Sequence, residues 1–456
     1  MAMSDTTGSI SLSDRTKHKP DYQLLVCVGI MVPFGLVMVY SASFVEGFVY
    51  YNNGLHYLLR QLFAAVVGTL GLLVAQRTNY RWWRNQALPL FIASLILLFV
   101  TGFILPRSIT EVNGSRSWIR LGFFSVQPSE FVKLTLIIYL ASWLSRRGTR
   151  LTNLLYGTIP FGVIVGLVTA LVMVGKDLGS ATIIVAVSAL IYFVAGASLF
   201  HLFFAGLLGL VSFLVGINVA AYRLDRINAW LDPFAYYSGA GFQPLHALYA
   251  LASGGIFGVG LGQSRQKYLW LPQSYTDTIL AIIGEEMGLI GTLFVVGCFA
   301  FVAYRGFKIA SSAPNTFGAL LATGITLWLV VQAIINLAVV TSLAPFTGIT
   351  LPFLSYGGTS LMISMVSAGI LLNISKYTLA DDARPHIHRR SCSFLAAGRG
   401  ATFIPLWQSP RPSQASQISP GWLMWAVPMA WKVISYVAKA RCRFGQSRRR
   451  QCVGVG

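Results

Sequence analysis

About ten apolar stretches recur along this chain, and each is close to the length that a helix needs to cross a lipid bilayer. Only 11% of the 456 residues are charged and 55% are hydrophobic, a balance that excludes a soluble domain of this length. We therefore expect an all-α, polytopic integral membrane protein with about ten transmembrane helices. The expected helices are Leu24–Tyr40, Leu58–Ala75, Leu88–Leu105, Phe131–Leu144, Leu154–Val174, Ala181–Ala195, Phe200–Val219, Ile279–Ala303, Phe317–Thr341 and Ser360–Leu372.

Lysine and arginine in the short loops set the expected orientation. They favour a cytoplasmic N-terminus, and an even number of helices then places the C-terminus in the cytoplasm as well. One outer loop breaks this rule, because it holds Arg107, Arg116 and Arg120. That loop is either a binding surface for an anion or a simple exception to a statistical rule.

The chain divides into three parts. Residues 1–22 are expected to form a cytoplasmic segment and residues 23–376 the membrane domain, with one long extracytoplasmic loop over 220–276 between the seventh and eighth helices. Residues 377–456 form a basic tail, which we expect to be disordered and cytoplasmic. Twelve basic residues and no acids lie after position 383, so more than half of the net charge of +20 belongs to the tail. It is either a genuine extension or the product of a frame change.

Three acids, Asp277, Glu285 and Glu286, lie on or in the expected eighth helix. A carboxylate costs roughly 2.5–3.5 kcal/mol in hydrocarbon, so such residues tend to face a bundle interior or a wet cavity and to be functional. Asp277 precedes the apolar run and is expected near water at the mouth of the helix, with the glutamates about 12–14 Å deeper. Alternatively, Asp277 caps the helix and the glutamates bond to neighbouring helices.

Two further polar groups are expected in the same outer region. Glu130 and Lys133 are three residues apart and share one face of the fourth helix, either as a structural ion pair or as substrate contacts. Asp177 lies in a tight turn, where it either caps the next helix or faces the substrate.

The connection between the ninth and tenth helices contains Pro352, Ser355, Gly357 and Gly358. Proline and paired glycines predict backbone that enters the membrane boundary without regular helix, which is tolerated only where protein or water satisfies it. We expect a re-entrant element that lines a cavity.

In order and spacing, these motifs resemble the SEDS proteins, the bacterial shape, elongation, division and sporulation glycosyltransferases. The resemblance covers about Asp21 to Tyr377. Residues 258–267 and the Leu-Asp-Pro at 231–233 look more like the division branch of that family than its elongation branch. The sequence departs from the family at Gln273, Tyr275 and Thr278, where glutamate, histidine and phenylalanine are usual, and at Lys176, where proline is common. The motifs are Asn-Gly-Ser-Arg-Ser-Trp-Ile-Arg at 113–120, Gln-Pro-Ser-Glu-Phe-Val-Lys at 127–133, Lys-Asp-Leu-Gly at 176–179, Tyr-Thr-Asp at 275–277 with Ile-Ile-Gly-Glu-Glu at 282–286, and Leu-Pro-Phe-Leu-Ser-Tyr-Gly-Gly at 351–358.

The resemblance implies that the chain polymerises lipid II into glycan strands on the outer face of the bacterial inner membrane during septal cell-wall synthesis and division. It implies a class B penicillin-binding protein transpeptidase, other divisome proteins and membrane lipid as partners; nucleic acid is not an expected partner. Asp277 matches the family's essential loop aspartate. Glu130, Lys133 and Asp177 match polar positions that line its central cavity.

Such a glycosyl transfer needs a base to deprotonate the attacking sugar hydroxyl and cations to stabilise the departing pyrophosphate. Asp277 is the candidate base. A divalent cation, Mg²⁺ or Mn²⁺, would share the second role, although no ligand cluster in the sequence requires one. The candidate cationic side chains are Arg116, Arg120, Lys133, Arg265 and Lys267.

Three other functions remain open from the sequence. Intramembrane acids and broken helices also suit a transporter that flips lipid II across the membrane. An elongation-type polymerase would use the same chemistry. A scaffold that only recruits a transpeptidase would leave the acid at position 277 unexplained.

Overall fold

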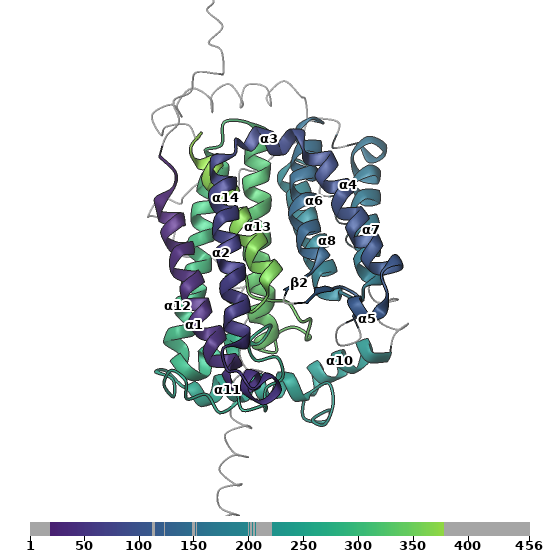
Figure 1. Cartoon of the computed structure of the whole chain (residues 1–456). Coiled ribbons are helices and arrows are strands. Elements are labelled where there is room, and N and C mark those ends of the chain that lie inside the picture. Colours follow the sequence, from purple (N-terminus) through teal and green to yellow (C-terminus); the bar gives the residue numbers. More distant parts are fainter. Residues whose placement is uncertain are drawn as a thin grey trace, which may run out of the picture.

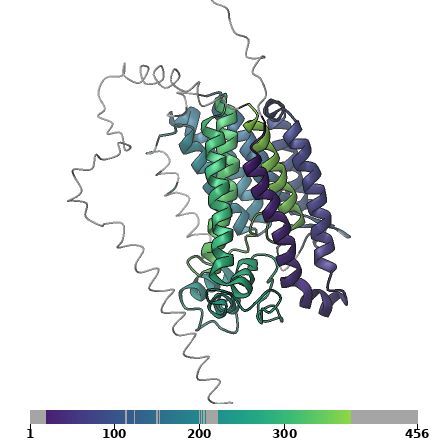
Figure 2. The same cartoon turned by 90° about the vertical axis from the view of Figure 1, so that its left-hand side faces the viewer.

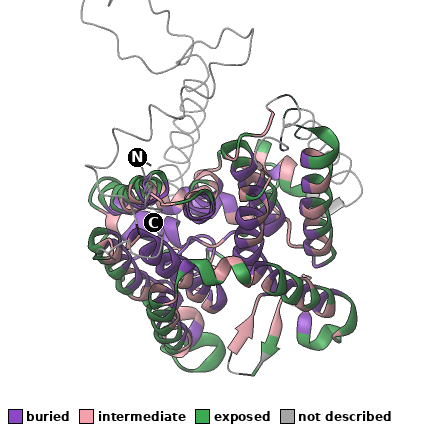
Figure 3. Ribbon diagram, turned by 90° about the horizontal axis from the view of Figure 1, so that it is seen from above, coloured by how far each residue is buried: buried purple, intermediate pink, exposed green. Residues whose placement is uncertain are grey.

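The computed structural model describes residues 19–377, except for 112–114, 123, 148–150, 152, 199, 201–202, 204–205 and 207–220. Its described part is an elongated bundle of long helices, with short elements gathered at the two ends (Figure 1). Seen along the bundle, buried residues fill the interior and exposed residues face outward from the helices (Figure 3). Large apolar side chains such as Val74 and Val163 are exposed, as expected for helices that face lipid.

Two sets of helices form the bundle, and α13 packs against members of both (Figure 1). The fully buried indole of Trp328 lies on α13. The first set is α1 (Tyr22–Tyr51), α2 (His56–Arg77), α12 (Ile279–Ser311), α13 (Thr316–Val340) and α14 (Gly358–Ser375). The second set is α4 (Ala87–Phe99) with its extension η1 (Val100–Ile104), α6 (Pro128–Ser145), α7 (Ile159–Val174) with η3 (Leu154–Thr158) before it, and α8 (Leu178–Val194).

Short elements connect these helices. The hairpin strands pair in antiparallel fashion, with Arg120 opposite Ser125. Helices α10 and α11 lie at one end of the bundle, and α3 lies at the other (Figures 1 and 2). The short elements are α3 (Tyr80–Asn85), α5 (Arg107–Thr110), β1 (Ile119–Leu121), β2 (Phe124–Val126), α10 (Ala221–Leu231) and α11 (Phe242–Gly254).

The all-α membrane fold expected from the sequence is confirmed. Seven of the described helices are long and apolar enough to cross a membrane, and α8 is a shorter apolar helix. Every expected stretch except Phe200–Val219 falls on a described helix. That stretch lies mostly outside the described residues, as do 1–18 and 378–456, so the number ten stays a prediction. The connection expected over 220–276 contains two helices, α10 and α11.

Helices α1 and α12 run antiparallel, and their contacts define the two ends of the bundle. At one end, here called the Asp21 end, Arg305 Nη2 lies 2.6 Å from Asp21 Oδ2. Towards the other end, the Asp277 end, Ser41 Oγ donates to Glu286 Oε1 at 2.7 Å. Between them, the rings of Phe34 and Phe294 have centroids 5.3 Å apart.

Helix α12 is broken at Gly288, whose backbone is left-handed with φ of 66°. Its first part, Ile279–Met287, packs against the glycine-rich segment 254–260. A Cβ on Gly258, at φ of +82°, would overlap the Glu286 carbonyl, and one on Gly288 would overlap the backbone of Ile256 and Gly258. Glycine at both positions therefore permits direct backbone contact between the two segments.

We expect Gly258→Ala to destabilise the folded protein by about 1 kcal/mol or more, because alanine disfavours positive φ and its methyl group would strike a carbonyl. The measurement is the midpoint of thermal unfolding in detergent. Gly29→Ala is the matched control, since nothing lies within 4 Å of a Cβ built there. Equal unfolding midpoints for both variants would contradict this account of the contact.

Candidate functional site

Asp277 occupies the loop immediately before α12, at the end of the bundle where α10 and α11 lie. Its side chain is only 3% exposed, which corrects the expectation of a residue open to water. Thr276 Oγ1 donates to Asp277 Oδ1 at 2.9 Å. The N-cap residue of α12 is Thr278, so the interpretation of Asp277 as its capping residue is also wrong.

Burial controls the acidity of this carboxyl group. Loss of solvation is the largest effect and raises the pKa of Asp277 from 3.8 to about 6. The hydroxyl of Thr276 and the guanidinium of Arg226 act in the opposite direction and lower the pKa. Asp277 is therefore a stronger base than an exposed aspartate, yet it remains mostly ionised at neutral pH.

Gly348 covers Asp277 on one side. A Cβ built on Gly348 would lie 3.7 Å from Asp277 Oδ2, and Gly348 itself is exposed. An exposed backbone position without a side chain thus lies next to this carboxylate oxygen. Arg226, the nearby cation, is exposed and donates from Nη1 to the Phe346 carbonyl at 3.2 Å.

A second polar group lies between α6 and α13. Lys133 Nζ lies 2.8 Å from Glu130 Oε1 and donates to Gln332 Oε1 at 3.1 Å. The ammonium group also lies 5.4 Å from the ring centroid of Trp328. Within the described part of the chain, Glu130 Oε2 is buried and has no hydrogen-bond partner. The ion pair considered in the sequence analysis is present, and it is buried.

Two amides on α13 join this group to Asp277. Gln332 Nε2 donates to the Thr350 carbonyl at 2.8 Å. One turn later, Asn336 Nδ2 donates to the Ile349 carbonyl and to the Asp277 carbonyl, both at 2.7 Å. Because residues four apart share one helix face, α13 holds the 349–350 backbone and the Asp277 backbone in one network with Lys133.

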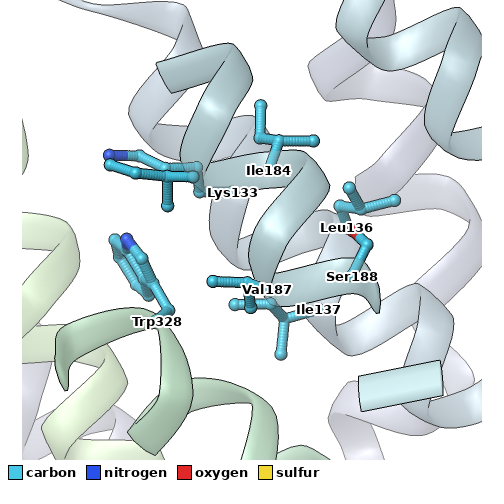
Figure 4. Close-up of a pocket in the computed structure, with 8 residues that line it drawn as sticks. Lys133, Leu136, Ile137, Ile184, Val187, Ser188 and Trp328 are labelled. Carbon is cyan, nitrogen blue, oxygen red and sulfur yellow. The ribbon is translucent and has the colours of Figure 1, made fainter. Parts of the chain in front are cut away.

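A small cavity lies beside Lys133, with room for about one water molecule. Lys133 and Trp328 lie close together at one side of this space (Figure 4). The lining is otherwise mostly aliphatic, and it does not include Asp277. The cavity is lined by Lys133, Leu136, Ile137, Ile183, Ile184, Val187, Ser188 and Trp328.

Asp177 caps α8, as one of the two interpretations of the sequence expected. Its Oδ1 accepts from the Ser180 amide at 2.9 Å, and its Oδ2 accepts from Gln127 Nε2 at 3.0 Å and from Ser129 Oγ at 2.9 Å. Close by, a Cβ on Gly179 would overlap the Thr347 carbonyl. The first turn of α8, which Asp177 caps, therefore packs against the same 347–350 segment.

The candidate arginines differ in their surroundings. Arg116 is half-buried and donates from Nη2 to the Leu105 carbonyl at 2.9 Å. Arg120 on β1 and Arg265 in the loop before α12 are exposed. Among the described residues, one arginine that lowers the pKa of Asp277 is Arg226, which was not among the residues expected from the sequence.

Lys267 is buried in an ion pair. Its Nζ lies 3.1 Å from Glu286 Oε1 and donates to the Gly262 carbonyl at 2.6 Å. Its expected role as a partner of the pyrophosphate stays a prediction. Glu285 accepts from the Arg265 amide at 3.0 Å and from the Ser264 hydroxyl.

The glutamates also lie less deep than one straight helix would place them. Glu286 meets Ser41 on α1, and Ser274, just before Asp277, donates to the carbonyl of the adjacent Ala42 at 3.1 Å. Ser274, three residues before Asp277, and Glu286 thus lie at one level of α1. The break at Gly288, which the sequence analysis did not anticipate, explains the difference.

The connection 347–357 leaves regular helix, as Pro352 and Gly357 predict. Gln61 on α2 holds it, donating from Nε2 to the Ser355 carbonyl at 3.0 Å and accepting from the Gly357 amide at 3.1 Å. Ser355 Oγ accepts from the Leu351 amide at 2.8 Å. Gly358 packs against the ring of Phe124 on β2.

The sequence analysis missed Gln61, Gln332, Asn336 and Arg226. The three amides stand in apolar helices, where a polar side chain signals an internal partner. Arg226 gave no comparable signal, since it lies far from Asp277 in sequence. Among the residues that the structure describes, no group of three His, Cys, Asp or Glu side chains could hold a metal ion.

The chain matches the model of the FtsW, RodA and SpoVE family, described as cell cycle proteins, over residues 22–380. It is 41% identical over 362 residues to stage V sporulation protein E of Bacillus subtilis, covering 79% of this chain and 98% of that protein. It is 42% identical over 355 residues to a probable peptidoglycan glycosyltransferase FtsW of Trichlorobacter lovleyi, covering 78% and 93%.

Two solved structures have the same fold. A chain of a peptidoglycan synthase complex, described as coordinating polymerization and crosslinking, superposes with a TM-score of 0.66 and 28% identity over 79% of this chain and 99% of that one. The rod shape determining protein RodA of Thermus thermophilus gives a TM-score of 0.58 and 26% identity over 79% and 98%. This multi-pass membrane protein belongs to the FtsW, RodA and SpoVE family of cell cycle proteins.

Proposed function

We propose that this peptidoglycan glycosyltransferase polymerises lipid II into glycan strands, with Asp277 as its general base. The observation that carries the proposal is the environment of Asp277. Its carboxylate is buried, its pKa is raised to about 6, and a nearby guanidinium favours its ionised form. A base of this strength is matched to proton transfer near neutral pH.

The reaction is an inverting transfer at the anomeric carbon of a lipid-linked sugar. Asp277 takes the proton of the acceptor hydroxyl, the hydroxyl oxygen bonds to the anomeric carbon, and the bond from that carbon to the pyrophosphate oxygen breaks. The leaving pyrophosphate needs cationic partners rather than a general acid. Arg226 is the nearest candidate, with the exposed Arg120 and Arg265 as further ones.

The 347–350 segment, which packs against Asp277, limits the access of the acceptor sugar to its carboxylate. Asp277 is buried and Gly348 lies next to its Oδ2, so we propose that the 347–350 segment shifts when the acceptor sugar reaches the base. Asn336 and Gln332 hold that segment through two carbonyl groups. A small displacement that keeps these bonds would expose the carboxylate.

The placement in the cell follows from the substrate. We propose that the Asp277 end faces the outside of the bacterial inner membrane and that both termini are cytoplasmic. A class B penicillin-binding protein transpeptidase would crosslink the strands, in line with the synthase complex to which one similar chain belongs. The relatives named FtsW favour septal synthesis with divisome partners over an elongation role.

Purified protein with lipid II and its transpeptidase tests the base assignment. We expect wild type to form glycan strands and Asp277→Asn to lose about 10²-fold or more of the rate, because the amide cannot accept the proton. Asp225→Asn is the matched control, since Asp225 is exposed on α10. Normal polymerisation by Asp277→Asn would refute the assignment, and lipid II movement across vesicles without polymer would establish a transporter instead.

Asp277→Asn should also stabilise the fold in a pH-dependent way. Because its pKa is raised from 3.8 to about 6, the stability that Asp277 contributes is fully present below pH 3.8 and is lost as pH rises through about 6. Two pKa units correspond to about 3 kcal/mol at pH 8. We expect Asn to raise the unfolding midpoint at pH 8 and to raise it about half as much at pH 5, with no such gain for Asp225→Asn.

Arg226→Gln should move the acid limb of the rate profile to higher pH. Removing this cation removes an effect that lowers the pKa of Asp277, so more of the base is protonated at any given acidic pH. High salt should shift wild type in the same direction, because Arg226 is exposed. Lys308→Gln, near the Asp21 end, should leave the limb in place. If the acid limb of the pH–rate profile lies at the same pH in Arg226→Gln and wild type, Arg226 does not lower the pKa of Asp277.

A further inference from the structure

Residues 256–261, together with Tyr268, Leu269 and Trp270, form an apolar surface at the Asp277 end of the bundle, here called the loop patch. Phe257 is 81% exposed, the largest exposed fraction among its apolar side chains. Tyr and Trp are the residues enriched where proteins meet lipid headgroups. The exposed members of the loop patch are Ile256, Phe257, Val259, Leu261, Tyr268, Leu269 and Trp270.

The loop patch is continuous with the outward surface of a membrane-spanning helix. The Leu289 amide donates to the Gly255 carbonyl at 2.9 Å, and the Ile290 amide donates to the Ile256 carbonyl at 3.3 Å. Leu289 and Ile290 are themselves exposed on α12. Exposed apolar residues of α12 are thus bonded through their backbone directly to the start of the loop patch.

The contact also lies within reach of the hydrocarbon layer. Leu289 and Arg305 are sixteen residues apart on α12, about 24 Å at 1.5 Å per residue, and Arg305 pairs with Asp21 at the opposite end. The hydrocarbon layer is about 30 Å thick. Residues that touch Leu289 are therefore placed at the margin of the hydrocarbon rather than far out in water.

The irregular backbone of residues 258–260 is satisfied by protein, which hydrocarbon requires. The amides of Val259 and Gly260 donate to the carbonyls of Glu285 and Glu286, both at 3.0 Å. The Gly258 amide donates to the Gly254 carbonyl at 2.8 Å. This segment thus presents apolar side chains outward while its backbone polar groups face α12.

The carboxylates of Glu285 and Glu286, next to this segment, are also shielded from lipid. Glu285 bonds to Ser264 and to the Arg265 amide, and Glu286 bonds to Ser41 and Lys267, so both carboxylates are turned into the protein. Both are 1% exposed. Neither of these two carboxylates therefore opposes entry of the loop patch into lipid.

We propose that residues 256–261 insert into the acyl chains of the leaflet at the Asp277 end, with Tyr268 and Trp270 at the headgroup level. The inserted loop anchors the first part of α12, because its backbone is bonded directly to Glu285 and Glu286. Asp277 lies at the start of that same short segment. The inference concerns lipid contact and stands whether or not Asp277 is the base.

Site-directed fluorescence measures this insertion. Phe257→Cys is labelled with a small environment-sensitive fluorophore, in a background with the five native cysteines replaced, and the protein is placed in lipid nanodiscs. We expect lipids brominated on their acyl chains to quench this label as strongly as one at Leu293→Cys, an exposed position on α12. A label at Ser238→Cys, exposed in the loop after α10, should be quenched several-fold less.

An aqueous quencher gives the opposite ranking. Iodide should quench the label at Ser238 and leave those at Phe257 and Leu293 nearly unaffected. Quenching by iodide at Phe257 in the isolated protein, with weak quenching by brominated lipid, would overturn the proposal. If that label became shielded only after the transpeptidase was added, the loop patch would be a protein docking surface instead, which also overturns it.

Discussion

A lipid bilayer offers no water to unpaired backbone groups, so a chain within it can leave helical structure only where protein supplies the missing partners. Two of the described segments that leave helix at the Asp277 end are 254–260 and 347–357. The backbone of α12 next to its break at Gly288 forms hydrogen bonds with the backbone of the first segment. The side-chain amides of Gln61, Gln332 and Asn336 form hydrogen bonds with the backbone of the second.

The same supports position the candidate base. Asn336 bonds to the carbonyls of both Asp277 and Ile349, so one amide fixes the distance between the carboxylate segment and the segment that covers it. One turn away, Gln332 links that cover to the buried pair of Lys133 and Glu130. The polar residues expected to line one cavity are thus joined mainly through backbone carbonyls, and the cavity beside Lys133 does not reach Asp277.

The sequence predicts the helices well because apolar length is a local property that survives folding. The position of a residue within the bundle depends instead on contacts between segments that are far apart in the sequence. The contact of Gly348 with Asp277 joins segments far apart in the chain, and the level of Glu286 depends on a break at Gly288 without a proline there. Sequence position singled out Asp277, and the need for cations at a pyrophosphate singled out Lys267, but the ion pair of Lys267 with Glu286 could not be predicted from either. Glutamine and asparagine residues in apolar helices are the sequence feature from which these internal hydrogen bonds could have been predicted.

Burial and catalysis make opposite demands on Asp277. Loss of water raises its pKa and strengthens it as a base, but the same loss makes the ionised form costly in the folded state. The exposed guanidinium of Arg226 offsets part of that cost without covering the carboxylate. Gly348, which lies next to the carboxylate, adds no side chain on that side. The structure thus holds a buried carboxylate beside the 347–350 segment, and the amides of Gln332 and Asn336 on α13 bond to the backbone of that segment.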